Sequence, residues 1–251
     1  FRSYPPFEFV TKDGVYAGIS SDYTKLVSER LGIKITRVPN LKWSEVLADT
    51  KAKKIDLLPA ITNTIERRKY LDFTQAHLKH PNVILTRDDF PFITGLADLK
   101  EQLVAMNKNY SATSYVKSQF PAIKLMEFET PLQSLEAVAT GKATATVLNL
   151  AVATYLIRQN KINNLKIAAP AEIKLPGLSM GVRKDWPELV SILDKVLQSI
   201  TPEEEKTIND RWVSLRFDVA ADTEALVRVG VQVGGTAVLI VLIIIGFIVI
   251  R

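Results

Sequence analysis

The chain has 251 residues, enough for one large domain or two small ones, and its apolar and charged fractions of 47% and 24% are typical of a globular protein. It contains no cysteine, which excludes disulfides, thiolate metal sites and cysteine nucleophiles. The net charge of +5 is mild and spread along the chain, so no nucleic-acid-binding stripe is predicted.

The first elements follow from turn and cap residues. The stretch from Phe1 to Phe9 is predicted to be a loop, because the two prolines after Tyr4 impose an extended backbone. Ser20–Asp22 provides good helix caps before an apolar face at helical spacing, and Gly32 is placed to end that helix. The alternation of apolar residues over 33–38 then predicts a strand.

The next segments predict an α/β fold. Trp43 precedes a helix expected over about Ser44–Lys53, and an apolar strand follows over Ile55–Ile61. Alternation of strands and helices is typical of a sheet in which ligands meet the loops at the carboxyl ends of the strands. Tyr4, Trp43 and the segment 62–67 all fall in such loops.

The stretch from Ala60 to Thr74 carries the most informative chemistry. Three small polar side chains at 62–64 follow the apolar strand, and the adjacent pair Arg67 and Arg68 comes three residues after them. Because a guanidinium fork matches the two oxygens of a carboxylate, this turn predicts a carboxylate site. The plainer alternative is that the two arginines are solvated at a helix start.

A second set of elements begins at about Leu96. A polar turn over Asn107–Ser111 leads to a helix expected near Ala112–Gln119, and a strand over Ala145–Leu148 ends at Asn149. Further elements are expected as strands over 83–86, 103–106, 123–128 and 178–182, and as helices over 132–140, from 150 to about 159, from Pro187, and from Thr201-Pro202 to about Trp212.

The C-terminal segment 230–250 contains no charged residue and is bounded by Arg228 and Arg251. At about 1.5 Å rise per residue, this segment is long enough to cross a hydrocarbon core of about 30 Å. One transmembrane helix is therefore predicted, with 219–229 as a short juxtamembrane connector. A cytoplasmic region is expected to follow the span.

Several segments together resemble a known family. They are Tyr4-Pro-Pro-Phe-Glu8, Gly18 with Asp22, Lys53-Lys-Ile-Asp56, Ala60-Ile-Thr-Asn-Thr-Ile-Glu-Arg67, Phe73-Thr74 and Met180-Gly-Val-Arg-Lys-Asp185. In this order they are similar to the type-2 periplasmic solute-binding proteins of family 3, the polar amino-acid-binding Venus-flytrap modules. The resemblance covers roughly Phe1 to Phe217. With the predicted span added, the chain resembles the sensory domain of a transmembrane receptor of the histidine kinase or diguanylate cyclase type.

The resemblance implies two lobes joined by two hinge strands, near Thr86–Asp89 and Gly181–Lys184. Lobe 1 is expected over 1–88 and 184–218, and lobe 2 over 89–183. A strand that is central to lobe 1 in the family is expected to be missing before Phe1. Ligand is expected in the cleft between the lobes.

The resemblance also assigns the ligand-binding residues. Arg67, helped by Thr62, is expected to clamp a ligand carboxylate. The Asn109–Ser111 loop, which carries Tyr110, is expected to reach the same carboxylate from a helix N-terminus. Tyr4 and Trp43 are expected as aromatic walls. The plainer alternatives are that Tyr4 caps the lobe and that Trp43 is a hydrophobic staple.

Asn149 is where the chain departs from the family pattern, which usually has an aspartate there to hold the ligand's α-ammonium. The ligand is then either an amino acid held less tightly or a small carboxylate without the ammonium; alternatively, Asn149 is a helix N-cap. The turn 107–109 also lacks the family's usual glycine. His77 and His80 are expected on the surface, and no catalytic residue, metal or cofactor is predicted.

Three functions remain open from the sequence. The first is a sensor module in the periplasm or outside the cell, anchored in a bacterial inner membrane and open to homodimer formation through the membrane-proximal region. The second is a solute-binding protein of an amino-acid ABC importer, against which the C-terminal span argues. The third is a cyclohexadienyl-dehydratase-like enzyme, for which Glu172 is the single candidate general acid.

Overall fold

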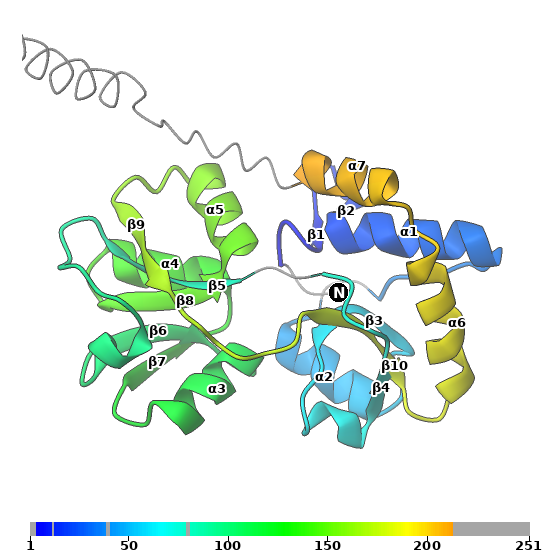
Figure 1. The fold of residues 1–251 in the computed structure, drawn as a ribbon, viewed down its shortest axis with the longest axis horizontal. Helices are drawn as coiled ribbons and strands as arrows, with labels where there is room; N and C mark the ends of the chain where they lie inside the picture. The colour runs from blue at the N-terminus through cyan, green and yellow to red at the C-terminus, as the bar shows by residue number, and fades with distance from the viewer. Residues whose placement is uncertain (1–3, 12, 39–40, 79–80, 213–251) are drawn as a thin grey trace, which may run out of the picture. The chain divides into compact units, whose positions relative to one another are not determined.

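The computed structural model describes residues 4–11, 13–38, 41–78 and 81–212. Their strands form two main sheets, one in each of two lobes (Figure 1). The sheet of lobe 1 has the order β3 (Leu57–Thr62), β10 (Leu178–Arg183) and β4 (Leu71–Phe73), with antiparallel pairing throughout. A separate two-stranded hairpin pairs β1 (Phe9–Val10) with β2 (Tyr16–Ala17).

Ser20–Asp22, predicted as helix caps, lie inside the first helix of lobe 1, whose N-cap is Gly18. The helices of lobe 1 otherwise lie close to their predicted ranges. They are α1 (Ile19–Leu31), α2 (Trp43–Lys51), the short η1 (Arg67–Lys69), α6 (Pro187–Gln198) and α7 (Pro202–Trp212). Gly32 ends α1 in the left-handed conformation at φ 64°. A capping box starts α7, because Thr201 Oγ1 accepts from the Glu204 N–H and Glu204 accepts from the Thr201 N–H in return.

Lobe 2 contains the five-stranded sheet, in the order β7 (Lys124–Phe128), β6 (Leu103–Asn107), β8 (Ala145–Asn149), β5 (Asn82–Arg87) and β9 (Leu165–Pro170). The strands β7, β6 and β8 run parallel, whereas β5 is antiparallel to both β8 and β9. The helical segments of this lobe are η2 (Leu96–Leu99), α3 (Ser111–Gln119), α4 (Pro131–Ala139) and α5 (Leu150–Gln159).

The two crossings between the lobes differ in position from the expected hinges. Among the described residues β5 pairs only with strands of lobe 2, whereas Leu78 bridges to Leu178 of lobe 1, so the chain passes from lobe 1 to lobe 2 before β5 begins. Because β10 pairs with β3 and β4 of lobe 1, the return crossing runs through 171–177. An apolar strand fits either sheet, so its hydrophobic pattern alone could not assign it to a lobe.

Two further expectations have a definite outcome. Residues 33–38, predicted as a strand from alternation, carry no strand assignment, since strand formation needs a paired neighbour as well as a pattern. The predicted connector 219–229 and the span 230–250 lie outside the described residues. Among the residues that the structure describes, no helix is both long and apolar enough to cross a membrane.

Candidate functional site

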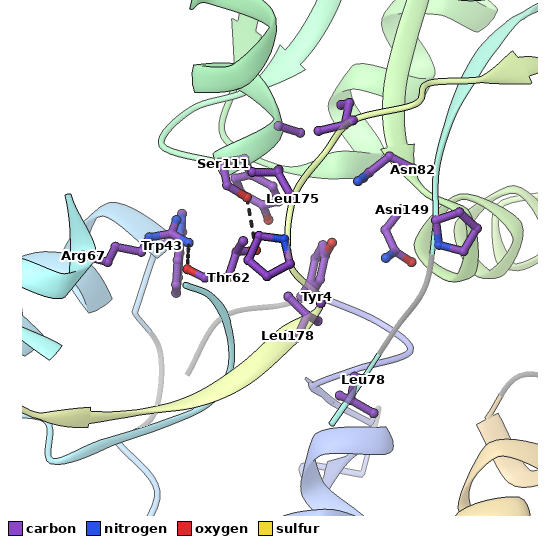
Figure 2. Close-up of a pocket in the computed structure, with 16 residues that line it drawn as sticks. Tyr4, Trp43, Thr62, Arg67, Leu78, Asn82, Ser111, Asn149, Leu175 and Leu178 are labelled. Carbon is purple, nitrogen blue, oxygen red and sulfur yellow. Dashed lines mark hydrogen bonds between the residues drawn. The ribbon is translucent and has the colours of Figure 1, made fainter. Parts of the chain in front are cut away.

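A cavity of about 500 Å³ lies between the two lobes and is lined from both of them (Figure 2). Each of the seven predicted site residues contributes to its wall: Tyr4, Trp43, Thr62, Arg67, Tyr110, Ser111 and Asn149. Four come from a loop, a strand end and two helix starts of lobe 1, and three come from lobe 2. The topology therefore brings together residues that are far apart in sequence.

Arg67 is buried, with 7% of its surface exposed, and it forms the start of η1 just after β3 ends. Its Nη1 donates to the Thr62 carbonyl at 2.9 Å, and its Nη2 donates to the Asn109 carbonyl at 3.1 Å. The guanidinium also lies over the Trp43 ring, 5.6 Å from the ring centre. Arg68, by contrast, is exposed and donates to Asn63 Oδ1. The alternative that both arginines are solvated is therefore correct for Arg68 and wrong for Arg67.

Asn109 belongs to the turn that was expected to reach the ligand, but the role of its carbonyl oxygen in joining the lobes was not predicted. Besides the Arg67 bond, it accepts from Trp43 Nε1 at 3.2 Å. Asn109 has φ 61°, the left-handed conformation that asparagine tolerates better than most residues other than glycine. Asn109 therefore adopts the turn conformation for which glycine is usual, by resemblance to the family. The absence of that glycine was the feature of the sequence that marked this turn.

Hydroxyl groups and aromatic rings complete the contacts across the cleft. Ser111 Oγ donates to Thr62 Oγ1 at 3.1 Å, as the dashed line in Figure 2 shows. Ser111 is the first residue of α3, so this helix presents its positive end to the cavity. The Tyr110 ring packs edge-on against Tyr4, with 5.7 Å between ring centres, and against Trp43 at 6.4 Å. With these contacts in place, the two lobes are closed on each other.

Asn149 caps α5, because its Oδ1 accepts from the Ala151 N–H at 3.0 Å. The helix-cap alternative is therefore correct, while the residue also lines the cavity. Sequence reasoning missed Asn82, which is the register partner of Asn149 on β5 and lies next to it in the wall (Figure 2). No local signal marked Asn82, since only the pairing of β5 with β8 brings the two amides together.

The crossing segments supply an apolar wall that the sequence also did not reveal. Leu78 and Leu178 form an isolated antiparallel bridge where the two crossings meet, and both line the cavity together with Ile173 and Leu175. Such apolar walls with few polar groups are typical of small-molecule pockets.

The enzyme alternative required a general acid inside the cleft. Glu172 is exposed and is not among the residues that line the cavity, so it does not fill that role. Within the described ranges, no group of three or more metal-ligating side chains could hold a metal ion.

His77 differs from its predicted surface position. Both ring nitrogens are enclosed and have no hydrogen-bond partner among the described residues, and the ring packs against Tyr23 with 5.0 Å between ring centres. Burial lowers the pKa of His77 to about 4. His80 lies outside the described residues.

Residues 2–215 match the family described as bacterial extracellular solute-binding proteins, family 3. The chain belongs to this family. Among curated family relatives, the virulence sensor protein BvgS of Bordetella pertussis is 28% identical over 210 residues, which is 83% of this chain and 17% of BvgS. A probable amino-acid ABC transporter-binding protein of Haemophilus influenzae is 29% identical over 215 residues, covering 84% of this chain and 81% of that protein.

Solved structures agree with the family 3 assignment. A histidine kinase sensor domain with similarity to periplasmic binding proteins superposes with a TM-score of 0.78 and 27% identity, covering 85% of this chain and 93% of that one. The periplasmic VFT2 domain of B. pertussis BvgS gives a TM-score of 0.76 and 25% identity, covering 84% and 89%. The two-lobed periplasmic-binding-protein fold expected from the sequence is thereby confirmed.

Proposed function

We propose that the described residues form the extracytoplasmic ligand-binding module of a transmembrane sensor, and that the module closes on a small carboxylate. The observation that carries this proposal is the cavity between the lobes, lined by the buried Arg67, by the Thr62 and Ser111 hydroxyls and by the start of α3. A guanidinium, hydroxyls and a helix N-terminus are the groups that proteins use to hold a carboxylate.

The cross-lobe contacts supply a mechanism for coupling. The Asn109 carbonyl of lobe 2 is bonded by Arg67 and Trp43 of lobe 1, and Ser111 bonds Thr62. These bonds exist only when the lobes are closed, so a ligand that touches both walls favours that state. A ligand shifts such an equilibrium only through its preference for one of the two states.

Signalling is proposed to pass from lobe closure through 219–229 into a membrane span at 230–250. The module then lies in the periplasm, anchored in the inner membrane, with a cytoplasmic kinase or cyclase domain beyond the span and a homodimer formed through the membrane-proximal region. The similarity to BvgS and to a histidine kinase sensor domain supports this arrangement.

An importer binding protein is the second candidate. The transporter-binding protein of H. influenzae, most of whose length is matched by this chain, supports it. The uncharged segment 230–250 favours the sensor, because a sensor requires a span after the module.

The span is tested by placing charges within it. The double substitution Leu242→Arg and Ile245→Arg is expected to release the chain from membranes washed with alkaline carbonate, because each arginine at a span centre costs about 2.5–3.5 kcal/mol. Leu242→Ala with Ile245→Ala is the matched control and should stay in the membrane fraction. Equal extraction of the parent chain and the arginine variant would contradict the anchor.

The carboxylate site is tested by Arg67→Ala. We expect it to weaken the binding of small carboxylates by about 100-fold, because a charge-assisted hydrogen bond contributes about 1.5–3 kcal/mol. The readout is ligand-induced thermal stabilisation in a panel of amino acids and small organic acids. Arg68→Ala, one residue away and exposed, is the control that should keep full stabilisation. Unchanged stabilisation of Arg67→Ala, with native circular dichroism, would refute the assignment.

A further inference from the structure

The described wall of the cavity carries positive charge and no negative charge. Among the sixteen described residues that line it, Arg67 is the one charged side chain, and no aspartate or glutamate is present. The rest of the wall is made of hydroxyls, two amides, aromatic rings and apolar side chains. The wall therefore complements an anion and offers no negative charge to a cation.

The part of the wall that lies away from Arg67 carries two amides. Asn149 pairs in register with Asn82 across β8 and β5. Figure 2 shows both side chains at the same part of the cavity, away from Arg67. Amides donate and accept hydrogen bonds but carry no charge.

An amino acid bound here would bury its ammonium without a carboxylate beside it. Removing an unpaired charge from water is costly, whereas a hydroxyl or a carbonyl of the same size needs only a hydrogen bond. The two amides meet that need for a neutral group: their N–H groups donate to either oxygen, and their carbonyl oxygens accept from a hydroxyl.

We infer that the pocket selects a 2-hydroxy or 2-oxo carboxylic acid with an apolar body, in preference to the α-amino acid of the same skeleton. This inference rests on the proposed function, because it assumes that a carboxylate occupies the Arg67 side of the cavity. The hydroxyl or keto oxygen meets the amides of Asn82 and Asn149. The apolar body packs on Leu78, Leu175 and Leu178.

Matched pairs of compounds test the inference on the full 251-residue chain. The pairs are L-lactate with L-alanine, (S)-2-hydroxy-4-methylpentanoate with L-leucine, and L-phenyllactate with L-phenylalanine, measured by titration calorimetry and thermal shift. In at least one pair the hydroxy acid is expected to bind about tenfold or more tightly than the amino acid. An amino acid that binds as tightly as its hydroxy partner, or more tightly, in every pair that binds overturns the inference.

Substitution of Asn149 provides the second readout. Asn149→Asp keeps a good cap for α5 and adds a negative charge, so it is expected to raise amino-acid affinity about tenfold and to weaken the hydroxy acid. Asn149→Ser also keeps a cap but adds no charge, and it should produce no gain for the amino acid. An equal gain in both variants overturns the inference.

The outcomes separate this inference from the proposed function. A preference for amino acids that is abolished by Arg67→Ala overturns the ligand class while the carboxylate site stands. Absence of binding for all six compounds overturns the inference. If Arg67→Ala also has no effect on any acid of the wider panel, the proposed function is overturned with it.

Discussion

Gly18→Ala is expected to destabilise the protein by about 3 kcal/mol or more, because two separate constraints act on this residue. Gly18 has φ 118° and ψ 173°, a backbone region that is open essentially to glycine alone. A Cβ atom built at this position would lie 2.5 Å from the Phe7 carbonyl oxygen and 2.7 Å from that of Pro6. Backbone atoms at these distances must move to admit a methyl group.

The movement is expected to reach the ligand site. The Pro6 and Phe7 carbonyls accept hydrogen bonds from the Ile19 and Ser20 N–H groups at 2.9 and 2.8 Å, which satisfies the first two N–H groups of α1. The same loop holds Tyr4, whose ring stacks on Phe7 and lines the cavity. Gly18→Ala should therefore weaken ligand binding as well as lower the free energy of unfolding.

Gly14→Ala is the matched control for this prediction. Gly14 also has a positive φ, 79°, but a Cβ there would meet no atom within 4 Å. Only the backbone penalty of about 1 kcal/mol then applies. Urea unfolding of both variants measures the difference, and equal destabilisation would show that the contact with the 6–7 carbonyls is not the cause.

Acidification is expected to remove about 3 kcal/mol of stability through His77. Its folded pKa of about 4 lies below the unfolded value of 6.5, so the unfolded state binds the proton more readily. The stabilisation is complete above pH 6.5, is lost as the pH falls from 6.5 towards 4, and changes no further below that. Asp194 and Glu205 line a second pocket in lobe 1, separate from the ligand cavity, together with His77. They reduce the loss to the extent that they attract the imidazolium.

His77→Phe isolates this contribution. Phenylalanine keeps an aromatic ring against Tyr23 but has no proton to bind. The unfolding free energies of the parent and the variant, measured in urea at pH 7.5, 5.5 and 4, should therefore converge or cross as the pH falls, while other titrating groups contribute equally to both. A constant difference between the two proteins at all three pH values would rule out His77 as the source.

Local chemistry in the sequence was enough to locate most helices and several site residues. The capping box at Thr201, the left-handed Gly32 and the apolar periodicity of α6 each depend on residues within a few positions, and each was predicted. The polar turn before Arg67 was recognised for the same reason. The roles of the seven site residues toward a ligand stay predictions, although all seven line one cavity.

The sequence by itself thus determined the α/β class, the family and the loop that carries Arg67. Only the tertiary structure decided which sheet receives β5 and β10, and hence where the chain crosses between the lobes. It also decided that the Asn109 carbonyl meets Arg67 and that Asn82 lies beside Asn149. The physical reason is that strand pairing and cross-lobe bonds join residues distant in sequence, and an apolar strand pattern specifies burial without naming its partner.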